Sequence, residues 1–169
     1  LRMRAIVCSE LGPPSKLSVQ EIVDPVPSPG EVVVDVAAAG LNFPDTLIIQ
    51  DMYQFKPERP FSPGGEVSGV VKAVGEGVTH LKVGQRVIGS CGWGGMREEL
   101  ALDAGRCIPI PDSVPFDESA AFVMTYGTSY YALKDRADPK PGEKLLVLGA
   151  AGGVGIAAVE LGKAMGLEV

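Results

Sequence analysis

The chain carries glycines at Gly149, Gly152 and Gly155, a GxxGxxG spacing that could bring the backbone close to a pyrophosphate. Glycine lacks a Cβ, so a turn built from it can approach a bulky anion closely. A helix that follows such a turn directs its unpaired N–H groups and the positive end of its dipole at the anion. The pattern predicts a dinucleotide held by the backbone of Gly152, Gly153, Val154 and Gly155.

The residues on either side of these glycines must form the elements that position them. The apolar run Leu145–Leu148 predicts a strand buried on both faces. Apolar residues then recur at roughly helical intervals between Ile156 and Met165, and Leu167–Val169 reads as the start of a second strand. A glycine-rich turn that only packs a helix on a strand is the alternative, but the order strand, turn, helix favours a dinucleotide site. The motif is not a P-loop, because no Lys-Ser or Lys-Thr follows the last glycine.

The composition indicates a folded protein with many turns. Hydrophobic residues make up 46% of the 169, and the 22 glycines and 14 prolines together exceed the usual share of about 12%. A net charge of −6 without a Lys/Arg cluster argues against binding to nucleic acid or an anionic membrane. We expect a cytoplasmic protein, because no apolar run could span a bilayer, the N-terminus lacks a signal-peptide core, and three scattered cysteines indicate reduced thiols.

The first two thirds of the chain alternate short apolar, often β-branched runs with Gly and Pro breakers. This spacing predicts a compact antiparallel barrel or sandwich. The expected strands are residues 3–8, 17–23, 31–39, 67–74, 87–89, 98–102 and 107–109. A short helical segment is expected after Asn42, with Pro44 in its first turn.

The pattern changes at Pro111, after which residues 116–123 and 126–134 predict helices. We therefore expect a β-rich domain over residues 1–120 and the start of a doubly wound domain over residues 121–169. A Rossmann sheet needs about six parallel strands. Since the sequence supplies one strand, one helix and the stub of a second strand, either the chain is a fragment or partner contacts cover an exposed sheet edge.

Five stretches of the sequence carry a resemblance to a known family: GLNFPD (40–45), PGGEVSGVVKAVGEGV (63–78), VGQRVIG (83–89), TYGTSYYAL (125–133) and GAAGGVGIAAVELGKAMG (149–166). In this order they resemble the first half of a medium-chain dehydrogenase/reductase of the quinone oxidoreductase (zeta-crystallin-like) branch. The resemblance implies an α/β protein with a β-rich GroES-like domain, lacking its C-terminal return, followed by the truncated start of a Rossmann doubly wound domain.

The resemblance also implies a function. Members transfer hydride from NADPH, with NAD not excluded, to a quinone or an α,β-unsaturated carbonyl, and the full-length protein would form a homodimer. Zinc-dependent members carry Cys and His where this chain has Asn42 and Gly65, so no metal is expected. The 169-residue chain alone is expected to be inactive and to bind NADPH weakly. A non-catalytic dinucleotide-binding fragment and an enoyl (acyl-CoA) reductase are the alternatives.

The family positions suggest individual roles. Asn42 and Tyr53 are the expected catalytic donors in the cleft, although Asn42 could instead cap a helix and Tyr53 could simply pack in its Pro-rich loop. Thr128 and Tyr130 are expected to face the cofactor, but Thr128 could instead bond back to its own helix backbone. Cys91, in a glycine-rich loop, is the cysteine whose reactivity we would test.

Overall fold

The computed structural model describes residues 2–169, which form two compact units. The first unit ends at Ala121 and the second is Phe122–Val169. The change of pattern that the sequence places near Pro111 thus precedes the division by a short helix, α2 (Phe116–Ala120), which belongs to the first unit.

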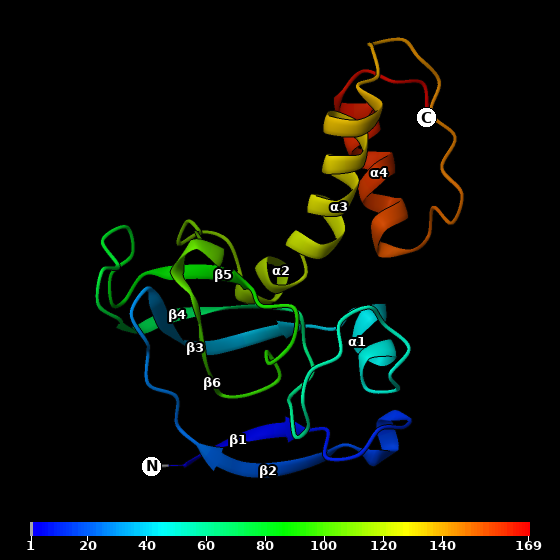
Figure 1. Ribbon diagram of the computed structural model, residues 1–169. Helices are drawn as coiled ribbons and strands as arrows, with labels where there is room; N and C mark the ends of the chain where they lie inside the picture. Colours follow the sequence, from blue (N-terminus) through cyan, green and yellow to red (C-terminus); the bar gives the residue numbers. More distant parts are fainter. Residues whose placement is uncertain (1) are drawn as a thin grey trace. The chain divides into compact units, whose positions relative to one another are not determined.

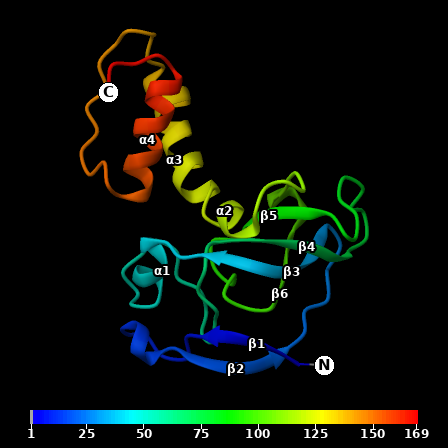
Figure 2. The same cartoon turned by 180° about the vertical axis from the view of Figure 1, so that it is seen from behind.

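The first unit contains a five-stranded antiparallel sheet in the order β6-β3-β4-β5-β7 and a separate hairpin of β1 and β2 (Figure 1). The strands of the sheet are β3 (Glu31–Gly40), β4 (Glu66–Val74), β5 (Arg86–Ser90), β6 (Glu99–Asp103) and β7 (Cys107–Pro109). The hairpin consists of β1 (Arg2–Val7) and β2 (Ser18–Val23). It forms a layer apart from the five-stranded sheet (Figure 1 and Figure 2). All seven strands lie at or within two residues of the expected ranges.

The sheet closes over one apolar core, which explains its strand pattern. Val32 and Val34 of β3 point to the same face and are completely buried in this core, as is Val67 of β4. Other members of this core are Val71, Leu81, Val87, Leu100, Leu102, Ala104 and Cys107. A second cluster under the short helix α1 (Phe43–Ile48) contains Cys8, Ile48, Ile49 and Phe61.

The short connections of the first unit include three helical turns: η1 (Pro14–Lys16) between β1 and β2, η2 (Ala104–Arg106) between β6 and β7, and α2. Helix α2 is shorter than the expected range 116–123. It ends at Ala120, where the chain passes into the second unit.

The second unit pairs one continuous helical run with a glycine-led helix. The run consists of η3 (Val123–Gly127), α3 (Thr128–Tyr130) and η4 (Tyr131–Ala137), and η3 and η4 have π-helical geometry. It ends at Asp138, which has a left-handed φ of 44°. The helix expected at 126–134 is confirmed, and the helical run is longer at both ends. Helix α4 (Gly153–Ala164) packs against α3.

The strand predicted at Leu145–Leu148 is wrong for this structure. Residues 145–148 form no strand, and the only bridge beside them is a parallel one between the preceding residue, Lys144, and Glu168. Leu146 and Leu148 are 84% and 85% exposed, so they are not buried on either face. A parallel strand needs neighbours on both sides and covering helices, and the second unit supplies only the three residues at 167–169. Within residues 2–169, no helix is both long and apolar enough to cross a membrane.

Candidate functional site

The N-terminus of α1 is organised by Asp45. Asn42 is the N-cap residue in an extended conformation, and Pro44 lies in the first turn as expected. Asp45 Oδ2 accepts a hydrogen bond from the Asn42 N–H at 2.8 Å, and Asp45 Oδ1 accepts one from the Gly64 N–H at 3.2 Å. Asp45 therefore ties the helix start to the loop before β4. Burial raises the pKa of this carboxyl, although these backbone N–H groups oppose the rise.

The side chain of Asn42 is held from the other side by Glu66, the first residue of β4. Glu66 is 1% exposed, and its Oε1 accepts a hydrogen bond from Asn42 Nδ2 at 2.8 Å. The donor atom is Asn42 Nδ2, so the amino half of the amide faces Glu66. The amino group carries a second N–H, and Asn42 is only half-buried. Asn42 is thus both a helix cap and an oriented hydrogen-bond donor.

Gly40 makes room for this contact. It pairs with Glu66 across β3 and β4. A Cβ at Gly40 would lie 2.9 Å from Glu66 Oε1 and 2.3 Å from the Ala120 carbonyl oxygen. Any larger residue would displace either the carboxylate or the end of α2. The carboxylate–amide pair therefore depends on a glycine at this position.

The donor groups near Asn42 differ from those of a metal centre. Gly65 contributes no side chain, and its carbonyl oxygen accepts from the backbone N–H groups of Cys91 and Gly92. The Asn42 amide and the Glu66 carboxylate are bonded to each other, and the Asp45 carboxylate accepts from backbone N–H groups. Across residues 2–169 the structure gathers no group of three or more His, Cys, Asp and Glu side chains that could hold a metal ion.

Tyr53 packs against apolar and aromatic side chains. It is half-buried and contacts the cluster of Cys8, Ile48, Ile49 and Phe61. Its ring meets Phe55 edge-on at a centroid distance of 5.5 Å, and Phe55 lies 6.2 Å from the Trp93 ring. This environment agrees with the packing alternative for Tyr53. It also fixes the ring, which any donor role would require.

The glycine turn before α4 serves two purposes. Gly149 has a left-handed φ of +71°, and its carbonyl oxygen accepts from the Gly152 N–H at 3.0 Å. A Cβ at Gly155 would lie 2.2 Å from that same oxygen, and a Cβ at Gly153 would lie 2.8 Å from Thr125 Cγ2. These two glycines therefore permit close packing. At Gly152, by contrast, an added Cβ would meet only the Gly149 carbonyl oxygen at 3.5 Å.

The open side of this turn can receive an anion. Gly152 is the N-cap of α4, and the Ile156 N–H makes the first intrahelical bond, to the Gly152 carbonyl. The N–H groups of Gly153, Val154 and Gly155 precede that bond, and the first turn contains no acidic residue. The backbone and helix dipole therefore suit a phosphate group at this end of the helix.

Thr128 and Tyr130 lie on α3, and both are exposed. Tyr130 lines a pocket of about 250 Å³ whose other walls are Phe122, Tyr126, Gly127 and Leu161. Ser129, between Thr128 and Tyr130 in the chain, is 2% exposed. Its Oγ donates to the Val154 carbonyl oxygen at 2.6 Å. The sequence patterns did not single out Ser129. Its only signal was a small polar residue among larger ones on a predicted helix.

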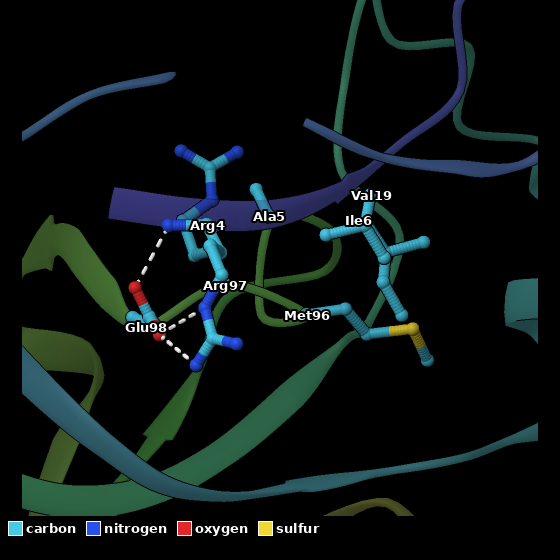
Figure 3. Close-up of a pocket in the computed structure, with 7 residues that line it drawn as sticks. All are labelled: Arg4, Ala5, Ile6, Val19, Met96, Arg97 and Glu98. Carbon is cyan, nitrogen blue, oxygen red and sulfur yellow. Dashed lines mark hydrogen bonds and ion pairs between the residues drawn. The ribbon is translucent and has the colours of Figure 1, made fainter. Parts of the chain in front are cut away.

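Two pockets of the first unit lie beside α1 and beside β1. One of about 160 Å³ beside α1 is lined by Pro14, Leu17, Leu41, Asp45, Thr46, Ile49, Pro63 and Met96. Another of about 220 Å³, drawn in Figure 3, is lined by Arg4, Ala5, Ile6, Val19, Met96, Arg97 and Glu98. In the second pocket Glu98 is ion-paired with Arg4. Asp45 connects the first pocket to the Asn42 site, because its carboxylate both lines that pocket and bonds the Asn42 N–H.

The cysteine that the sequence marks for a reactivity test is shielded. Cys91 is half-buried, and its thiol donates to the Gly64 carbonyl oxygen at 3.3 Å. Burial raises its pKa to about 12, so the thiol is protonated at neutral pH. The thiolate is the reactive form. The structure therefore argues against a nucleophilic role for Cys91.

Comparison with known proteins places this geometry in a family. Residues 28–112 match the family described as "Alcohol dehydrogenase GroES-like domain". The "Quinone oxidoreductase-like protein 2 homolog" of Nematostella vectensis is 44% identical over 163 residues, which cover 94% of this chain and 43% of that protein.

Solved structures agree over nearly the whole chain. The human synaptic vesicle membrane protein VAT-1 homolog-like protein superposes with a TM-score of 0.95 and 34% identity, covering 98% of this chain and 53% of that one. The quinone oxidoreductase of Thermus thermophilus, also solved with NADPH, superposes with a TM-score of 0.85 and 40% identity. The match covers 98% of this chain and 51% of that one. The CurK enoyl reductase superposes with a TM-score of 0.88 and 31% identity, and the match covers 99% of this chain and 52% of that one.

The chain spans about half the length of the relatives that it matches. The family match covers the five-stranded sheet of the first unit, and the structural matches extend through the glycine turn and α4. The chain belongs to the medium-chain dehydrogenase/reductase superfamily, in its quinone oxidoreductase branch, and corresponds to the N-terminal portion of that fold.

Proposed function

We propose that this chain forms the substrate-binding domain and the first phosphate-binding turn of an NAD(P)H-dependent reductase, which acts without zinc on a quinone or an α,β-unsaturated carbonyl. The observation that carries the proposal is the open glycine turn at the start of α4. Relatives named quinone oxidoreductases, one of them solved with NADPH, support it. Because the chain spans about half their length, the activity is proposed for a protein of that length that contains this chain.

The proposed cofactor site rests on two features of the turn, the helix-start N–H groups that precede the first intrahelical bond and the open space at Gly152. The N–H groups of Gly153, Val154 and Gly155 would donate to the pyrophosphate, and Gly152 would allow its close approach. NADPH, when bound, supplies the hydride. Thr128 and Tyr130 are proposed to contact its nicotinamide end, since Ser129 between them anchors α3 to the first turn of α4.

Asn42 is proposed to donate a hydrogen bond to the acceptor's oxygen. Hydride addition to a quinone or an enone leaves negative charge on that oxygen, and a fixed donor aimed at it lowers the barrier. One N–H of the Asn42 amino group is held by Glu66, which leaves the other with a defined direction. Tyr53 is the second proposed donor. Its ring is held in place by the cluster below it.

A catalytic zinc does not fit this donor set. Such a site needs three protein ligands and an open position. Gly65 has no side chain, and the Glu66 carboxylate already accepts from the Asn42 amide. We therefore propose that hydrogen-bond donors of the protein perform the role of a Lewis acid here.

Two other functions remain as candidates. An enoyl reductase acting on an acyl thioester is favoured by the similarity to the CurK enoyl reductase. A dinucleotide-binding protein without turnover would keep the glycine turn but not need the Asn42–Glu66 pair. These three functions differ in which acceptor, if any, is reduced.

The experiment uses a protein of the relatives' length that contains this chain and follows the loss of NADPH absorbance. Benzoquinone and crotonyl-CoA serve as acceptors, each with and without a zinc chelator. We expect NADPH oxidation with benzoquinone, at a rate that the chelator leaves unchanged. Turnover with crotonyl-CoA alone would favour the enoyl reductase, and NADPH binding without any turnover would favour the non-catalytic protein. Loss of activity with the chelator would overturn the zinc-independent mechanism.

A further inference from the structure

A third pocket of the first unit has no place in the proposed reductase mechanism. It has a volume of about 340 Å³ and lies between the loop that follows β5 and the β6–η2 segment. Its walls are Cys91, Trp93, Gly94, Arg97, Leu100, Ala101, Leu102, Asp103 and Arg106. Leu100 and Leu102 belong to the apolar core, so the floor is apolar while two arginines stand in the walls.

Arg97 brings a half-buried positive charge to this pocket. Its guanidinium lies against Gly94, where an added Cβ would be 3.7 Å from one terminal nitrogen. Its Nε is buried and, within residues 2–169, has no hydrogen-bond partner. Burial lowers the pKa of Arg97, but a guanidinium stays charged in proteins. A charge and an unmet donor that are removed from water are both costly unless something binds them.

The acidic residues near Arg97 are already engaged. Glu98, the next residue in the chain, is ion-paired with Arg4, and of the two arginines in Figure 3 only Arg4 is joined to it. Glu99 is paired with Lys72. In the wall itself, Asp103 Oδ1 accepts from the Gly105 N–H at 2.7 Å.

The second arginine adds to the positive charge. Arg106 is exposed at the rim of the pocket, and neither it nor Arg97 takes part in an ion pair within the part of the chain that the structure describes. Both positive charges act on Cys91, where they oppose the effect of burial on its pKa. The Cys91 thiol is neutral and supplies no counter-charge. The pocket therefore offers two guanidinium groups, one carboxylate already bound to backbone, and an aromatic wall.

We propose that this pocket binds a small oxyanion, the carboxylate or phosphate group of a small molecule, with Arg97 as its principal ligand and Arg106 as the second. The guanidinium fork matches the two oxygens of such a group. The indole of Trp93 and the side chains of Leu100 and Ala101 would contact an apolar body attached to the anion. The site involves none of the groups assigned to the reductase and stands whether or not that function is correct.

Trp93 gives the test a local probe, because it is the only tryptophan of the chain. Its fluorescence is followed while the chain is titrated with sodium benzoate and, separately, with inorganic phosphate, at an ionic strength held constant with chloride. We expect a saturable change with at least one of the two. Saturation with benzoate identifies a carboxylate site with an apolar wall, and saturation with phosphate identifies a phosphate site.

Three variants decide whether the arginines are responsible. Arg97→Gln should weaken binding at least tenfold, and Arg106→Gln at least threefold. Arg136→Gln, which removes an exposed positive charge from the second unit, should leave the affinity unchanged. Circular dichroism checks that each variant is folded. If Arg97→Gln does not fold, Arg106→Gln decides, because that side chain is exposed. A change that does not saturate with either anion, or an affinity that neither arginine variant lowers, overturns the proposal.

Discussion

The Glu66 carboxylate accepts a hydrogen bond from the Asn42 amide at 2.8 Å, although the two residues are 24 positions apart in the chain. The register of β3 and β4 produces this contact, because Gly40 pairs with Glu66 and Asn42 follows two residues later. The pair converts a half-buried amide into a donor of fixed direction. A carboxylate that is 1% exposed thereby orients the group that is proposed to meet the substrate oxygen.

Glu66→Gln tests whether that orientation matters. Glutamine has the same shape but can donate as well as accept, so it no longer dictates which half of the Asn42 amide faces it. For the proposed reductase we expect kcat to fall about tenfold, less than the loss of about 100-fold or more that follows outright removal of such a donor. The KM for NADPH should stay unchanged. Steady-state kinetics measure both, and equal kcat values for the two proteins would show that Glu66 only fills space.

Asp45→Asn should destabilise the first unit, and by an amount that depends on pH. Asparagine can accept only one of the two backbone hydrogen bonds that Asp45 accepts, a loss of about 1–3 kcal/mol. Because burial raises the folded-state pKa above 3.8, the stability contributed by Asp45 is full below pH 3.8 and is lost as pH rises through the folded pKa. The variant should therefore be destabilised more at acidic than at neutral pH.

Urea unfolding followed by Trp93 fluorescence reports on the first unit alone, since that unit contains the only tryptophan. Glu98→Gln provides a control in which the destabilisation should depend on pH in the opposite direction. Backbone and side-chain hydrogen bonds from Arg4 lower the pKa of Glu98 below 4.5, so its contribution is present above pH 4.5 and is lost on acidification. A destabilisation of Asp45→Asn that grows toward neutral pH would contradict a raised pKa for Asp45.

Gly155→Ala and Gly152→Ala form a matched pair within one turn. A Cβ at Gly155 would lie 2.2 Å from the Gly149 carbonyl oxygen, whereas one at Gly152 would lie 3.5 Å from it. We expect the first substitution to destabilise the second unit by about 1–3 kcal/mol through overpacking. The second should cost less than about 1 kcal/mol, because alanine is a poor N-cap but fits. Thermal unfolding followed by circular dichroism compares them, and equal effects would mean that the turn is not packed as described.

Cys91 should react slowly with a thiol reagent in the folded chain. Its pKa of about 12 leaves almost no thiolate at neutral or mildly alkaline pH. In urea all three cysteines should react at the rate of free thiols. Cys91→Ser identifies the contribution of this residue to the time course. A single fast-reacting thiol that disappears in Cys91→Ser would contradict the shielding seen in the structure.

Local pattern was enough to predict the strands of the first unit. Val32, Val33 and Val34 form a continuous β-branched run that is buried throughout, and glycine and proline mark the turns. Leu145–Leu148 shows the limit of such reasoning. An apolar run predicts burial only if other strands exist to cover it, and the three residues at 167–169 make one bridge. The pattern belongs to a sheet larger than the one that the second unit contains.

The candidate site was predictable as residue types but not as contacts. Asn42 and the glycine turn stand out in the sequence, whereas the bond from Asn42 to Glu66 depends on a strand register that no local pattern specifies. Ser129 is a further example. Its bond to the Val154 carbonyl exists only because α3 and α4 pack side by side. Contacts between distant segments therefore had to come from the structure.

Calorimetric titration of NADPH into the wild-type protein of the relatives' length and into its Gly152→Val variant tests the central claim most directly. A Cβ at Gly152 would meet only the Gly149 carbonyl oxygen, at 3.5 Å, so we expect α4 to stay folded while the valine side chain blocks the approach to its N-terminus. We expect the variant to bind NADPH at least about tenfold more weakly, a loss of about 1.4 kcal/mol, with an unchanged circular dichroism spectrum. An unchanged affinity would show that the pyrophosphate does not bind at this turn.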